Sequence, residues 1–158
     1  MRSFEIKDVK KFMSLLLVKE TFDDFCVVSL KIKTFVETDI DGTLNPRWGE
    51  GEGRYAGWGM VRKLAYEIIK GSKSPERIKL VLMAGEGVKE RMLPESEDLI
   101  TDADGMVNIC FEEDKLTVTT GISMKTFDPD MSQNFGKKWD AAVEIFLESN
   151  ELRYTVFS

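Results

Sequence analysis

The chain has 158 residues, 42% of them hydrophobic, which is typical of one packed domain and excludes wholesale disorder. It carries 22 Lys and Arg against 28 Asp and Glu, and this net charge of −6 disfavours nucleic acid or an anionic lipid surface as a partner. The chain has no histidine, which excludes Ser-His-Asp and Cys-His catalytic pairs and histidine-bound zinc. Any catalysis would therefore depend on carboxylates, Lys, Tyr or a metal held by oxygen ligands.

The N-terminal part of the chain predicts a helix followed by a strand. Residues 1–8 mix acidic and basic side chains and lack the apolar core of a secretory signal, so we expect a cytoplasmic protein without a membrane span. Apolar side chains at i, i+3, i+4, i+7 and i+8 over residues 9–17 predict an amphipathic helix with Asp8 as its N-cap. Apolar and polar side chains then alternate from residue 25 to residue 36, which predicts a strand with one face in water.

The middle of the chain predicts a loop, a second helix and a further strand. Residues 39–59 are rich in glycine and read as an irregular segment. The helical stripe returns over residues 61–69, and Gly71 is well placed as the C-terminal cap. Alternation over residues 78–84 predicts a strand, and a short helix is expected near residues 88–93.

The C-terminal part predicts a hairpin, a third helix and a last strand. Alternation over residues 107–111 and 116–122, joined by a short acidic turn, indicates a β-hairpin. A helical stripe over residues 139–147 and a strand over residues 152–156 follow. Without an internal repeat or linker, residues 1–158 form a single domain. We predict an α+β fold in which about three amphipathic helices pack on one face of a mainly antiparallel sheet.

The segment Asp39-Ile40-Asp41-Gly42-Thr43-Leu44 resembles the opening D-x-D-G-T-L signature of the haloacid dehalogenase-like phosphatases. That resemblance implies a Mg²⁺-dependent phosphatase in which Asp39 attacks phosphorus and Asp41 is the general acid and base. Such a nucleophile should end a buried parallel strand, but an alternating strand with lysines precedes Asp39. The chain also repeats D-x-D-G at Asp102-Ala103-Asp104-Gly105, and Asp-Gly is favourable turn chemistry. We therefore interpret both segments as turns and keep the phosphatase as the alternative.

The other partners of phosphatase chemistry are not recognisable in the sequence. A Lys followed by further acids should complete the charge balance around Mg²⁺. The acids that follow the lysines near residue 138 are Asp140, Glu144 and Glu148, and their i, i+4 spacing predicts the solvated face of a helix. We therefore expect no resident metal ion and no cofactor.

Three aromatic side chains, Trp48, Tyr55 and Trp58, flank the glycine-rich segment and are candidates for a ligand-binding or partner-binding surface. Exposed aromatic residues commonly anchor interfaces. The alternative is that they pack this segment onto the core, because Trp is usually well buried.

The two cysteines, Cys26 and Cys110, lie far apart in the sequence and outside any C-x-x-C pattern. We expect two free thiols, with a single disulfide as the alternative.

Several stretches spread along the chain resemble an uncharacterised family of short bacterial proteins, a domain of unknown function. These stretches are residues 1–9, 21–25, 69–71, 74–75, 116–121, 125–127 and 139–140. The resemblance covers nearly the whole chain and implies a stand-alone bacterial cytosolic protein, and it brings no activity, ligand or catalytic residue. We expect a small cytosolic, non-catalytic binding or regulatory protein with an unknown protein or small-molecule partner, the phosphatase being the alternative.

Overall fold

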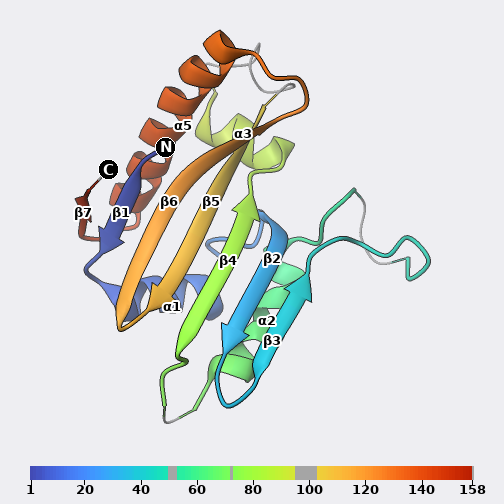
Figure 1. Ribbon diagram of the computed structural model, residues 1–158, viewed down its shortest axis with the longest axis vertical. Helices are drawn as coiled ribbons and strands as arrows, with labels where there is room; N and C mark the ends of the chain where they lie inside the picture. The colour runs from blue at the N-terminus through green and yellow to red at the C-terminus, as the bar shows by residue number, and fades with distance from the viewer. Residues whose placement is uncertain (50–52, 72, 95–102, 158) are drawn as a thin grey trace.

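Seven strands form one sheet in the computed structural model, which describes residues 1–49, 53–71, 73–94 and 103–157 (Figure 1). Their order across the sheet is β3-β2-β4-β5-β6-β1-β7, and each neighbouring pair is antiparallel. The strands are β1 (Ser3–Ile6), β2 (Cys26–Lys33), β3 (Glu37–Asp41), β4 (Arg77–Met83), β5 (Ala103–Glu112), β6 (Lys115–Met124) and β7 (Tyr154–Val156).

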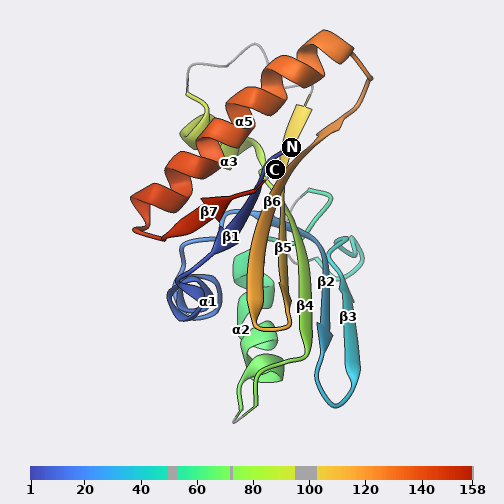
Figure 2. The same ribbon diagram turned by 60° about the vertical axis from the view of Figure 1, so that its left-hand side comes forward.

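The helices of the described chain are α1 (Val9–Leu17), α2 (Trp58–Ile69), α3 (Glu86–Met92) and α5 (Pro129–Ser149). Helix α2 packs on β2, α5 packs on β5 and β6, and α3 contacts α5. Figure 2 shows α1, α2 and α5 on the same side of the sheet. The predicted α+β fold, with amphipathic helices on one face of a mainly antiparallel sheet, is confirmed.

One row of buried side chains shows how the core is built. Leu30, Leu80, Ile109, Val118 and Phe4 are direct cross-strand neighbours on β2, β4, β5, β6 and β1, and each is at most 2% exposed. Because side chains alternate between the two faces of a strand, a slip of one residue would move this row into water. The hydrophobic pattern therefore fixes the register of the central sheet.

The segment predicted as one strand over residues 25–36 is instead a strand and a turn. Strand β2 ends at Lys33, and the backbone N–H of Thr34 donates to the carbonyl of Val36 at 2.9 Å. The chain then returns as β3, which pairs with β2 along its whole length. The interpretation of Asp39–Leu44 as a turn is therefore wrong for Asp39 to Asp41, because their acid–apolar alternation belongs to the second strand of a hairpin.

The glycines of the two D-x-D-G segments do not serve a turn with positive φ. They allow neighbouring groups of the protein to approach the backbone closely. A Cβ on Gly42 would lie 1.8 Å from the carbonyl oxygen of Val27, and a Cβ on Gly105 would lie 2.3 Å from Cε2 of Trp139. Gly105 lies inside β5, and Asp102 lies outside the described residues. The turn interpretation is therefore wrong at Ala103–Gly105 as well, because neighbouring groups occupy the space of a side chain.

Helix α5 begins well before the predicted stripe at residue 139. Its N-cap is Asp128, whose carboxylate accepts hydrogen bonds from the backbone N–H groups of Asp130 and Met131 at 3.0 and 3.3 Å. Pro129 occupies the first helical turn, where its missing N–H is not needed.

All three acids predicted on the solvated face of α5 have partners on the sheet side of the helix. Asp140 is 8% exposed and accepts a hydrogen bond from the hydroxyl of Thr120 on β6. Glu144 pairs with the guanidinium of Arg2 at 2.6 Å. The hydroxyl of Tyr154 on β7 lies 2.9 Å from Glu144 and 2.7 Å from Glu148, and of the three acids only Glu148 is exposed. The prediction is wrong for Asp140 and Glu144 because α5 lies beside strands that present polar partners to it.

Candidate binding surface at the β3 edge

The two aspartates of the D-x-D segment lie on β3, the strand at one edge of the sheet (Figure 1). Alternation puts Asp39 and Asp41 on the face away from the helices, together with Glu37. The side chain of Asp39 is 65% exposed and lies 3.9 Å from the ammonium of Lys31. The carboxylate of Asp41 accepts a hydrogen bond from the backbone N–H of Thr43 at 2.9 Å, which lowers the pKa of Asp41 below its usual range.

This placement differs from the geometry expected of a phosphatase nucleophile. Asp39 lies within an exposed antiparallel edge strand, whereas the chemistry calls for the end of a buried parallel strand. Among the described residues, no group of three or more acidic or cysteine side chains is placed to hold a metal ion. The three acids of β3 form an acidic row, which Lys31 and Arg77 partly neutralise.

The three aromatic candidates do not form one surface. Trp58 is 1% exposed, and its indole N–H donates to the carbonyl of Leu16 at 2.8 Å. Its assignment to a partner surface is therefore wrong, because the ring anchors α2 in the core. Trp48 is 78% exposed, and Tyr55 is half-buried with the guanidinium of Arg54 5.1 Å from its ring centroid. A role for these two residues stays a prediction.

Exposed apolar side chains gather instead on the β2–β3 turn and on one flank of α2. Phe35, at the turn, is 96% exposed, and its neighbour Val36 is 51% exposed. Met60 and Leu64 of α2 are 53% and 55% exposed and lie one turn apart on the same flank. The sequence pattern missed these residues, because it placed Phe35 in a strand and Leu64 in the buried stripe.

The contacts of Arg62 show which way this flank faces. The Arg62 side chain lies on the opposite flank, where it pairs with Asp23 at 2.8 Å and donates to the carbonyl of Val18 at 3.3 Å, just beyond α1. The flank with Met60 and Leu64 therefore faces away from α1. We call this side of α2, which continues to Ile68, the outer flank.

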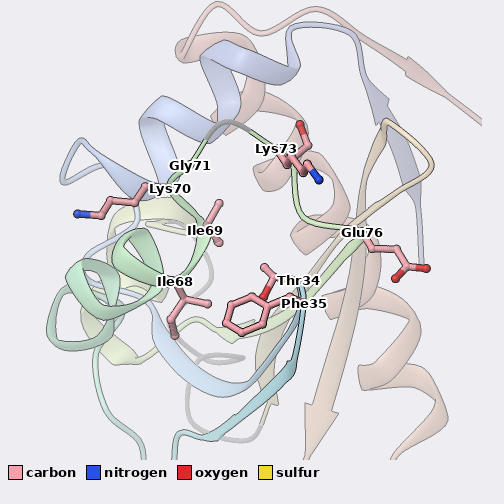
Figure 3. A pocket seen from close by; sticks show the side chains of 9 residues that line it. Thr34, Phe35, Ile68, Ile69, Lys70, Gly71, Lys73 and Glu76 are labelled. Carbon is pink, nitrogen blue, oxygen red and sulfur yellow. The ribbon is translucent and has the colours of Figure 1, made fainter.

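A pocket of about 520 Å³ opens where the outer flank meets the β2–β3 turn (Figure 3). Figure 3 shows the Phe35 ring directed into the pocket beside Ile68. Apolar side chains form its wall and charged ones its rim, namely Phe35, Ile68, Ile69, Lys70, Lys73 and Glu76. Its volume lies in the range of pockets that accept small ligands or anchoring side chains.

A buried lysine at the other end of β4 has a structural role. Lys89 of α3 is 2% exposed, and its ammonium donates to the carbonyl of Ala103 at 3.1 Å and to Asp104 at 2.7 Å. On the β4 side of β5, the backbone N–H of Ala84 donates to the carbonyl of Gly105. The ammonium of Lys89 thus donates to the Ala103 carbonyl of β5, where a backbone N–H of a neighbouring strand would otherwise donate. Its hydrogen bonds to Ala103 and Asp104 compensate for the burial of its charge.

Comparison with protein families gives a match along most of the chain: residues 15–155 match the family described as Family of unknown function (DUF5721). The chain belongs to this family. The resemblance to an uncharacterised family is thereby confirmed. No curated protein and no solved structure matches the chain. In the part of this DUF5721 member that the structure describes, no helix has the length and apolar character needed to cross a bilayer.

Both cysteines of this DUF5721 member are free thiols, as predicted. Burial, together with the negative charge of Asp104, raises the pKa of the Cys26 thiol above its usual value. Because the thiolate is the nucleophilic form, this environment does not activate Cys26.

Proposed function

We propose that this DUF5721 member is a small, non-catalytic binding protein that recognises a protein partner through the outer flank of α2 and the β2–β3 turn. The observation that carries the proposal is the near-complete exposure of Phe35 at the turn, together with the half-exposed Met60 and Leu64 along the outer flank. Contiguous exposed apolar groups mark interaction sites, and aromatic side chains at their centre contribute most to affinity.

The extent of this surface favours a protein over a small molecule. Met60 and Ile68 lie eight residues apart on α2, so the outer flank extends for about 12 Å before it reaches the pocket. A protein segment can contact both the flank and the pocket, with an apolar side chain placed beside Phe35.

The proposal also covers the cell compartment of the protein and the class of its partner. Two unbridged thiols support a reducing compartment, such as the cytoplasm of a bacterium. The net charge of −6 supports a partner other than nucleic acid or an anionic membrane.

Affinity capture with paired surface variants tests the proposal. Tagged wild type, a Phe35→Asp/Leu64→Asp double variant and a Phe127→Asp control are each incubated with lysate of the source cells. Phe127 is a matched control because it is 78% exposed and lies in the connection from β6 to α5. We expect wild type and the Phe127→Asp control to capture the same defined set of proteins. The double variant should fail to capture this set. Identical recovery by all three baits would contradict the proposed surface.

A further inference from the structure

The outer edge of β3 presents backbone groups that are directed away from the sheet. Within the described residues, β3 pairs along Glu37–Asp41 with β2 alone. The N–H of Thr34 donates to Val36 and that of Gly42 donates to Val28, at 2.9 and 3.0 Å. Both bonds fit the β2–β3 register, in which hydrogen-bonded and non-hydrogen-bonded pairs alternate.

This alternation decides which residues can accept a new strand. The N–H and C=O groups of Thr38 and Ile40 are directed to β2, whereas those of Glu37, Asp39 and Asp41 are directed to the outer edge. A strand added at this edge would form its ladder with the three acidic residues.

The side chains beside the edge define the chemistry of such a strand. On the open face, a neighbour of β3 would lie next to the acidic row of Glu37, Asp39 and Asp41, each of which is exposed. On the inner face it would lie next to the half-buried Ile40 and, at the β2–β3 turn, the pocket where Ile68 of the outer flank meets Phe35. Opposite charges across neighbouring strands are stabilising and like charges are destabilising. Alternating basic and aliphatic side chains therefore match both faces.

A second copy of this chain does not fit the same edge. Antiparallel pairing of β3 with another β3 would place acidic rows beside each other on the open face, which like-charge repulsion opposes. Charged residues on edge strands commonly prevent such self-association. The acidic row, which Lys31 and Arg77 neutralise only in part, thus opposes pairing with a second copy of β3.

We propose that the β3 edge binds an extended, basic and amphipathic segment of a partner protein by strand addition, with Lys or Arg beside the acidic row and aliphatic side chains against Ile40 and the pocket at the β2–β3 turn. This deepens, and rests on, the proposed function, because it names the chemistry and the binding mode of the partner. Main-chain hydrogen bonds would supply affinity, and the alternating side chains would supply specificity.

Synthetic peptides test the proposal with the intact chain. The probe is a seven-residue peptide that alternates lysine and valine. The controls are the same peptide with glutamate for lysine and a peptide of the same composition in which the residues do not alternate. Amide hydrogen exchange, followed by NMR, should show new protection at Glu37, Asp39 and Asp41 with the lysine–valine peptide only. Binding should weaken as salt is added, because the paired charges are exposed.

Two variants separate the backbone contribution from the charge contribution. Asp39→Pro removes an outward N–H and the Asp39 carboxylate without removing a bond to β2. It should abolish binding, a larger loss than removal of the charge alone. Val156→Pro is the matched control, because the β1–β7 register directs its N–H away from β1 at the other edge of the sheet. Glu37→Gln/Asp39→Asn keeps every N–H and should weaken the lysine–valine peptide by roughly 2- to 30-fold, since two cross-strand charge pairs are lost.

The possible outcomes distinguish this inference from the proposed function. Absence of protection at the β3 edge, or equal binding of the lysine and glutamate peptides, would overturn strand addition even where capture depends on Phe35 and Leu64. If Asp39→Pro does not fold, an unchanged affinity of the Glu37→Gln/Asp39→Asn variant would by itself overturn the charge selection. If the proteins captured from lysate are the same with and without Phe35 and Leu64, the proposed function is overturned, whether or not the peptides bind the β3 edge.

Discussion

The indole ring of Trp139 packs directly against the backbone of Gly105. A Cβ at residue 105 would lie 2.3 Å from Cε2 and 2.4 Å from Cδ2 of the ring, well inside van der Waals contact. Trp139 is fully buried, and its N–H donates to the carbonyl of Met106 at 3.0 Å, which holds the ring in place. This contact fixes the position of α5 on β5.

Gly105→Ala should therefore destabilise the fold strongly. Overpacking a close-packed core costs about 1–3 kcal/mol, and a contact this short should place the change at about 3 kcal/mol. Urea unfolding followed by circular dichroism measures the loss. The control is Gly136→Ala in α5, where the new methyl group meets no atom within 4 Å. That change should instead stabilise the protein by about 0.5–1 kcal/mol, because alanine is the better helix former.

The buried hydrogen bond between Thr120 and Asp140 should show strong energetic coupling. Thr120→Val and Asp140→Ala each leave the other partner with one hydrogen bond fewer, in a site that is largely closed to water. Hydrogen bonds to charged groups contribute about 1.5–3 kcal/mol. A double-mutant cycle by urea unfolding should return a coupling energy of this order. Additive effects of the two substitutions would show that the bond contributes nothing to stability.

The ion pair of Asp8 and Arg153 should make stability depend on pH in the acid range. Hydrogen bonds from the guanidinium and the backbone N–H of Arg153 lower the pKa of Asp8 from 3.8 to about 2. A carboxyl with a lowered folded-state pKa stabilises the fold above its unfolded pKa, and this contribution is lost as the pH falls through about 4 toward 2.

Asp8→Asn should accordingly lower the melting temperature at pH 6, and the difference from wild type should shrink toward pH 2. Melting curves at five or six pH values measure this convergence. Glu113→Gln, which removes an exposed acid from the β5–β6 turn, serves as the control for net charge. A constant difference between wild type and Asp8→Asn at all pH values would contradict the assignment.

The phosphatase alternative gives a separate expectation. Asp39 lies in an exposed antiparallel strand, so we expect no turnover of an aryl phosphate above background with Mg²⁺. Wild type and Asp39→Asn should behave alike in this assay. Metal-dependent turnover that Asp39→Asn abolishes would establish the enzyme and overturn the non-catalytic proposal.

Local sequence patterns were sufficient to predict the helices and most strands. The stripes over residues 9–17 and 61–69 correspond to α1 and α2, and the short helix near residues 88–93 corresponds to α3. The β2–β3 hairpin was missed because the turn at Thr34–Val36 contains neither glycine nor proline, and Phe35 continues the apolar pattern. The β3 edge, which holds the candidate site, could not be recognised without that hairpin.

The sequence by itself determined the fold class and the buried rows of the central sheet, because periods of 2 and 3.6 residues are local properties of the chain. Only the tertiary structure decided which apolar side chains of a helix such as α2 are buried by neighbouring elements. Trp58, outside the predicted stripe, is buried and Leu64, inside it, is exposed, because α1 and the sheet cover one side of α2 and leave its outer flank open. It also decided that Asp140 is buried against Thr120 while Asp39 stays in water at the edge. Such burial depends on contacts between residues far apart in the sequence.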